Sequence, residues 1–115
     1  DPQSGGEEAL GRVFNALAAA YDYDQAGDDV QLIFQGAGTR WPELLQKPDH
    51  PANGLYQAVQ HVVAGVSCGC AGVFGATESA TSAGMELITD NPVPGTPGVT
   101  SIRNLTSQGF TVHTF

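Results

Sequence analysis

The amino-acid sequence predicts an α/β fold: a three-layer sandwich in which helices cover a mostly parallel sheet of four to five strands. Amphipathic helical segments alternate along the chain with short β-rich segments, and this alternation is typical of parallel sheets. The 115 residues suit a single domain, and 41% of them are hydrophobic, which is enough to build one core. We therefore expect residues 1–115 to form one α/β domain.

The first predicted element is a helix between Ser4 and Tyr21. Its apolar residues recur at helical spacing: Leu10, Val13, Phe14, Leu17 and Ala18. Ser4, followed by Glu7, resembles a capping box and predicts the start of the helix. Residues 21–29 contain four Asp and one Gly, so we expect an exposed connection there.

The middle of the chain predicts two strands and the helices between them. The segment 30–34 is a nearly continuous β-rich run that ends at glycines, as expected for a strand covered on both faces. Residues 41–45 predict one short helical turn, and 51–64 predict a second amphipathic helix. A strand fits 65–68, and a further helix is expected to begin near Gly69.

The last third of the chain predicts two more strands. The first covers 85–88, and a loop dense in proline and glycine follows at 90–98. Residues 102–105 predict a short helix, and the alternating segment 110–114 predicts the final strand. Doubly wound folds normally begin with a central strand, so we expect that a first strand precedes Asp1 and is missing from this sequence.

Charge and hydropathy exclude several classes of function. Asp and Glu number 12 against 4 Lys and Arg, which gives a net charge of −8 at pH 7. The four basic residues are scattered along the chain, so direct binding of nucleic acid is not expected. Residues 1–29 carry seven acids and one Arg, which places most of the acidity at one end. No apolar run approaches the length of a membrane span and no signal peptide is recognisable, so we expect a soluble cytoplasmic protein with no membrane partner.

Two cysteines are the strongest candidate for a chemical site. Cys68 and Cys70 lie where a strand passes into a helix, and reactive groups in open α/β sheets gather beyond the carboxyl ends of strands. The N–H groups at a helix start favour a thiolate. Neighbours in an extended segment point to opposite faces, which argues against a disulfide between these two. Two alternatives stay open: the thiols are small buried hydrophobes, or they bind a metal together with His61.

A glycine-rich turn is the second candidate. Gly36, Gly38 and Arg40 follow a predicted strand and resemble half of a nucleotide-binding fingerprint, although the third glycine and an immediate long helix are absent. Arg40 would meet a bound anion at the carboxyl edge of the sheet. The alternatives are a plain tight turn and a salt bridge between Arg40 and a local Asp or Glu.

The sequence offers few candidate residues for a catalytic base and few motifs that would bind a cofactor. A catalytic base for a thiol would have to be one of three histidines: His50, His61 or His113. Local sequence favours a polar helix position for His61 and an outward strand position for His113. A complete nucleotide fingerprint and a zinc-binding C-x₂-C pair are both absent, so no cofactor and no metal is expected.

The succession of motifs resembles the DsrE/DsrF-like family of small α/β proteins. The similar segments are Asp29–Gly38 and, after the strand that ends in Cys, Cys70–Gly75. Leu87–Asp90, the proline-rich loop and Ser107–Phe115 are similar to the strand, helix and strand that close the family's fold. The similarity covers nearly the whole chain. It implies a flavodoxin-like topology with a first strand before Asp1.

The resemblance also implies a function. Family members typically form trimers or hexamers, and some carry a persulfide on a cysteine at this junction and pass sulfur between protein partners in oxidation or tRNA thiolation. It implies Cys70 as the sulfur carrier, with Cys68 as a resolving or buried neighbour, and sulfur-donor and acceptor proteins as partners. The alternative that stays open is a noncatalytic oligomeric binding module. Its cysteines would be structural, and its Gly36–Arg40 edge would bind a small ligand or a partner protein.

Overall fold

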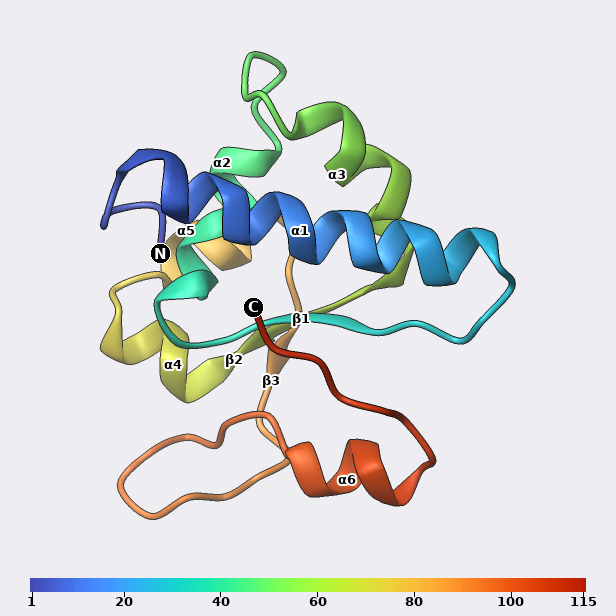
Figure 1. Cartoon of the computed structure of the whole chain (residues 1–115). Helices are drawn as coiled ribbons and strands as arrows, with labels where there is room; N and C mark the ends of the chain where they lie inside the picture. Colours follow the sequence, from blue (N-terminus) through green and yellow to red (C-terminus); the bar gives the residue numbers. More distant parts are fainter.

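Helices and a small sheet alternate along the chain in the computed structural model, which describes residues 1–115 (Figure 1). The elements in chain order are α1 (Gly6–Gln25), β1 (Leu32–Phe34), η1 (Gly36–Arg40), α2 (Trp41–Leu45), α3 (Asn53–Val59), η2 (Gln60–Val62), β2 (Val63–Ser67), α4 (Cys68–Val73), α5 (Thr77–Ser82), β3 (Leu87–Ile88) and α6 (Ile102–Ser107). The predicted α/β class is confirmed.

The sheet is parallel and has three strands. The strand order is β1-β2-β3, so β2 lies in the centre and pairs with both neighbours. The strands predicted at 30–34, 65–68 and 85–88 are confirmed, with ends that differ by up to two residues. In Figure 1, α1 and α3 lie above the strands and α6 lies below them. None of the helices combines the length and the apolar character that crossing a bilayer requires.

The start of α1 differs from the prediction. Gly5 precedes the helix with φ of 72° and supplies no side-chain cap. The Ser4 hydroxyl instead donates a hydrogen bond to the Asp1 carbonyl at 2.8 Å, so the predicted capping box with Glu7 is wrong. The reason is the pair Gly5-Gly6, whose positive φ angles turn the chain into the helix without help from Ser4.

The end of α1 also differs, because the helix continues to Gln25 through much of the acidic segment that predicted a connection. Asp24 stabilises this extra turn, since its carboxylate pairs with the His61 imidazole at 2.9 Å. Gly27, with φ of 85°, then directs the chain away from the helix. The prediction of an exposed connection holds only for the few residues between α1 and β1.

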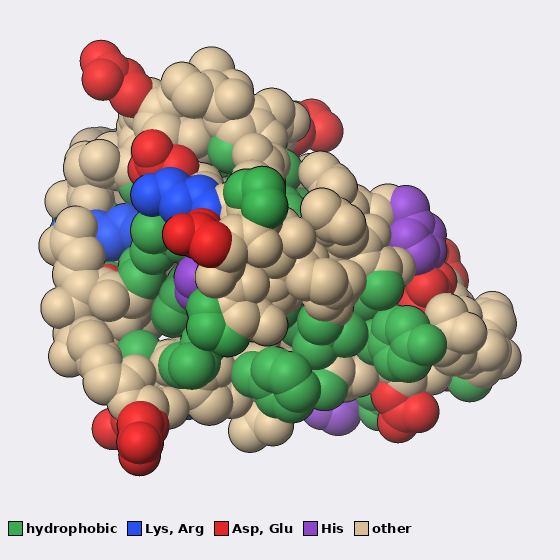
Figure 2. All heavy atoms as spheres, turned by 90° about the horizontal axis from the view of Figure 1, so that it is seen from above, with side chains coloured by type: hydrophobic (Ala, Val, Ile, Leu, Met, Phe, Trp, Pro, Cys, Tyr) green, Lys and Arg blue, Asp and Glu red, His purple; other side chains and the backbone are tan.

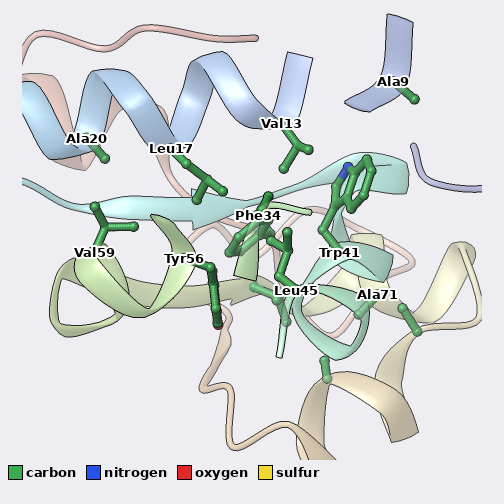
Figure 3. Packing of buried hydrophobic residues seen from close by; sticks show 14 residues of the cluster. Ala9, Val13, Leu17, Ala20, Phe34, Trp41, Leu45, Tyr56, Val59 and Ala71 are labelled. Carbon is green, nitrogen blue, oxygen red and sulfur yellow. The ribbon is translucent and has the colours of Figure 1, made fainter. Parts of the chain in front are cut away.

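The hydrophobic core lies between α1, the sheet and the helices that follow β1. Figure 3 shows Val13 and Leu17 pointing from α1 toward β1, and the same cluster contains Trp41 and Leu45 from α2. Leu17 and Leu45 are fully buried. This packing fixes the position of β1 and of the segment η1 that follows it.

Tyr56 of α3 carries a polar group into this core. The side chain is fully buried and its hydroxyl makes no hydrogen bond. Burial raises the pKa of the Tyr56 phenol above its usual value of 10.0, and the nearby Gln46 side chain offsets a smaller part of this rise. An unsatisfied buried hydroxyl costs about 1–3 kcal/mol.

Replacing Tyr56 with phenylalanine is therefore expected to leave stability unchanged or to raise it by about 1 kcal/mol at neutral pH. The phenol ionises in the unfolded chain at about pH 10, but only at higher pH in the folded protein. The free energy of unfolding of the wild type should thus decrease as the pH rises through 10 and above. The Tyr56→Phe variant, which has no phenol at this position, should show a smaller decrease. Urea unfolding at pH 7 and pH 10.5 measures both effects; a variant that is destabilised at pH 7 would contradict the assignment.

The C-terminal segment is extended but unpaired. The strand predicted at 110–114 is wrong, because Thr111–Phe115 forms no backbone–backbone hydrogen bond. An extended segment becomes a strand only when a neighbouring strand supplies hydrogen-bond partners. The segment is held by side chains instead: the His113 ring stacks on Tyr23 of α1, with ring centroids 5.9 Å apart.

Candidate functional site

Both thiols lie directly after the carboxyl end of the central strand. β2 ends at Ser67 and α4 begins at Cys68, so the two cysteines occupy the first turn of α4, at the strand-to-helix junction that the sequence predicts. Both thiols are free and partly exposed. Neither cysteine belongs to the buried hydrophobic cluster, and the alternative in which both are structural stays a prediction.

The proline-rich loop packs directly on the start of α4. Asn91 and Val99 close this loop, each N–H donating to the other's carbonyl at 2.8 and 2.9 Å. The Gly69 N–H donates to the Gly98 carbonyl at 2.8 Å, and a Cβ atom at position 69 would approach the Val99 side chain to 2.8 Å. The glycine between the two cysteines is therefore required for this close contact. Sequence reasoning missed its role, although the Cys-Gly-Cys pattern and the Pro-Gly dipeptides were the available signals.

Hydrogen bonds connect the carboxyl ends of β2 and β3. The buried Ser67 hydroxyl accepts the Thr100 N–H at 3.1 Å. Beyond β3, the Asp90 carboxylate accepts the Ser101 N–H at 2.8 Å and the Asn104 side-chain amide at 3.3 Å. These hydrogen bonds hold the segment that leads into α6 against the carboxyl ends of β2 and β3, next to the start of α4.

Arg40 reaches α4 from the end of η1. Its Nε donates to the Phe74 carbonyl at 2.9 Å, and its guanidinium lies over the Phe74 ring, 5.5 Å from the centroid. A second nitrogen pairs with the Asp1 carboxylate at 3.2 Å. The structure thus brings the two predicted sites together, because η1 packs against α4. It also shows the predicted alternative, a salt bridge between Arg40 and a local acid.

The glycines of the turn serve the backbone of η1. Gly36 has φ of 57°, and its carbonyl accepts the Thr39 hydroxyl at 2.9 Å. The Gly38 N–H donates to the Gln35 carbonyl at 3.0 Å. A bound anion would have to compete with these internal partners, so ligand binding by Gly36, Gly38 and Arg40 stays a prediction.

Helix geometry separates the two thiols. In an α-helix, residues that are two positions apart in the sequence are rotated by about 200° around the helix axis. Cys68 and Cys70 therefore project to different sides of α4. Cys70 lies one turn before Phe74, and residues at this spacing share a helix face. Cys70 therefore shares a helix face with Phe74, the residue that Arg40 contacts, whereas Cys68 is one turn before the fully buried Ala71.

None of the three histidines forms part of the thiol site. His61 is at the amino end of β2 and pairs with Asp24, so it is separated from Cys68 by the length of the strand, about 16 Å at 3.3 Å per residue. His113 stacks on Tyr23, and the His50 ring nitrogen accepts the Ala52 N–H. No three side chains of His, Cys, Asp or Glu are grouped to hold a metal ion, and His61 does not join the cysteines.

The site therefore combines two partly exposed free cysteines in the first turn of α4 with Arg40, which contacts Phe74 directly after this helix. Sulfur nucleophiles of this kind attack disulfide or persulfide sulfur without a cofactor. Comparison with protein-family models, with curated proteins and with solved structures gives no match for this chain.

Proposed function

We propose that this protein is a DsrE-like sulfur carrier that accepts and donates sulfane sulfur through Cys70. The observation that carries the proposal is the position of Cys70: a partly exposed thiol in the first turn after the central strand, on the helix face of Phe74, which Arg40 contacts. The finer fold, a DsrE-like sandwich with flavodoxin-like topology, is part of the same proposal, although the sheet has three strands here instead of the expected four to five.

The reaction needs no oxidant. The Cys70 thiolate attacks the outer sulfur of a donor persulfide, R–S–SH, which forms Cys70–S–SH and releases the donor thiolate R–S⁻. In the second step an acceptor thiolate attacks the same outer sulfur and leaves Cys70 as a thiolate again. Each step breaks one S–S bond and forms one, so the electrons balance.

Arg40 and Cys68 have separate roles in this proposal. Negative charge moves between sulfur atoms during each attack, and the Arg40 guanidinium is the cation that contacts Phe74, on the same helix face as Cys70. Part of its charge is offset by Asp1, which limits the effect. Cys68 lies on another side of the helix and acts as a neighbour rather than as the carrier.

The partners that we propose are sulfur-donor and acceptor proteins and further copies of this chain, as a trimer or hexamer in the cytoplasm. Exposed apolar side chains on α1, among them Phe14 and Tyr21, support association with a partner. Figure 2, seen from the side that carries α1, shows hydrophobic side chains gathered in the lower half of the view. Light scattering of the purified protein tests the assembly: one chain per particle would refute it.

The proposed activity is tested by sulfur loading of the reduced protein. After incubation with glutathione persulfide, intact-mass measurement should show an added mass of about 32 Da, one sulfur atom, on the wild-type chain. The double variant Cys68→Ser/Cys70→Ser is the control and should gain nothing. Wild-type protein that gains no sulfur, although iodoacetamide alkylates its thiols, would refute the carrier function and favour a binding module.

A further inference from the structure

A large groove runs along β1. Its volume is about 770 Å³, and its walls come from four parts of the chain: α1, β1 with the residues before it, the start of α6, and the C-terminal segment 109–115. In Figure 1 the C-terminal segment, drawn in red, passes in front of β1 and beneath α1. The groove is separate from the thiols, since neither cysteine lines it.

Two walls of the groove are extended backbone with unused hydrogen-bonding groups. β1 is an edge strand, because the sheet order places β2 on one side of it and no strand on the other. A second wall, Thr111–Phe115, makes no backbone–backbone hydrogen bond with any part of the chain. Both segments line the same groove, so both offer free backbone donors and acceptors to a strand that enters it.

The other two walls of the groove favour a bound strand with apolar side chains. α1 contributes small residues, Ala16, Ala19 and Ala20, and the α6 side contributes Ile102 and Leu105. Successive side chains of a strand point to opposite faces of the sheet. A strand in this groove would therefore place alternate side chains against α1 and against α6, and both sets would have to be apolar.

Thr100 adds an unsatisfied polar group to the same groove. The residue is only 7% exposed, it lines the groove, and its hydroxyl has no hydrogen-bond partner. Buried hydroxyls are normally paired. An inserted backbone would bring carbonyl and N–H groups into this region.

The charges at the two ends of the groove indicate the direction in which a bound strand would run. Asp28 and Asp29 line the groove just before β1, and neither forms an ion pair. The acid at the opposite end, Asp1, is already paired with Arg40. A strand that runs parallel to β1 would begin beside Asp28 and Asp29, so basic residues at its amino end would be complementary.

We propose that this groove binds an extended peptide strand that runs parallel to β1, with an apolar β-branched run preceded by Lys or Arg. The strand would pair with β1 on one side and with the C-terminal segment on the other, which would give a five-stranded sheet. This explains why the alternating sequence of residues 110–114 has strand character without a strand partner.

The test uses a synthetic peptide, Lys-Lys-Val-Ile-Val-Val-Val-Ser, and hydrogen–deuterium exchange of the full chain. Binding should slow the exchange of backbone amides in 31–35 and 111–115 by roughly tenfold or more. The control peptide has proline in place of its central valine, which removes one N–H and breaks strand pairing. It should bind at least about tenfold more weakly.

A chain variant separates strand pairing from nonspecific apolar binding. Thr111→Pro/Val112→Pro removes two successive N–H groups, one of which faces the groove in any extended conformation. The melting temperature of the free protein should not change, because these groups form no backbone hydrogen bond. Peptide affinity should fall by roughly tenfold.

Three results would overturn the proposal. Equal protection by both peptides would show apolar adsorption, and protection confined to other segments would place the peptide elsewhere. Dimers of the free protein that already protect 31–35 and 111–115, and that the peptide does not dissociate, would show that a second copy fills the groove.

Discussion

Replacing Gly65 with alanine is expected to lower the free energy of unfolding by about 2–5 kcal/mol. Gly65 lies in the central strand β2 with φ of 148°, a conformation that L side chains rarely adopt. A Cβ atom there would also meet the Glu86 carbonyl oxygen. That carbonyl accepts the Val66 N–H at 2.9 Å, so the clash cannot be relieved without breaking a bond between β2 and the segment that leads into β3.

A matched control exists in α1. Gly11 has no positive φ, and a Cβ atom there would meet nothing within 4 Å. Gly11→Ala should therefore raise stability by about 0.5–1 kcal/mol. Urea unfolding followed by the fluorescence of Trp41, the single tryptophan and a buried one, measures both variants. Equal midpoints for Gly65→Ala and the wild type would contradict the described register of the sheet.

Replacing Cys70 with serine is expected to reduce the rate of sulfur loading by roughly two orders of magnitude, because a hydroxyl is not ionised at neutral pH and is a poor nucleophile toward sulfur. Cys68→Ser should retain most of the loading rate. The two substitutions are chemically identical and lie two residues apart in the same helical turn, so each controls for the effect of the other on folding.

The contrast follows from the sides of α4 that the two thiols occupy. Cys70 shares a face with Phe74, which Arg40 contacts, whereas Cys68 is one turn before the buried Ala71. Time-resolved intact-mass measurement of each variant gives the rates. Equal rates for both variants would show that the position relative to Arg40 has no influence, and a slow Cys68→Ser variant beside a fast Cys70→Ser variant would move the carrier role to Cys68.

The sequence predicted the parts of the fold that depend on local pattern. The hydrophobic periodicity of α1 and the β-rich run before Gly36 were sufficient because each element buries one continuous apolar surface. The strand-to-helix junction at Cys68 was also predictable from local pattern, because a short β-rich run is followed there directly by a helical segment.

The failures concern features that depend on distant partners. The acidic end of α1 remains helical, and there Asp24 pairs with His61, which is far away in the sequence. The contact of Gly69 with the loop at Gly98 likewise joins segments that no local pattern relates. The segment 110–114 has the alternation of a strand, but pairing requires a neighbour, and the edge of β1 beside it is open.

The most direct test of the sulfur-carrier proposal is to locate the added sulfur in the wild-type protein. After loading with glutathione persulfide and alkylation, fragmentation mass spectrometry can separate Cys68 from Cys70, because Gly69 lies between them. We expect the extra sulfur on Cys70 and its loss, with recovery of the free thiol, when an acceptor thiol is added. Sulfur confined to Cys68, or no sulfur on either residue, would contradict the proposed function.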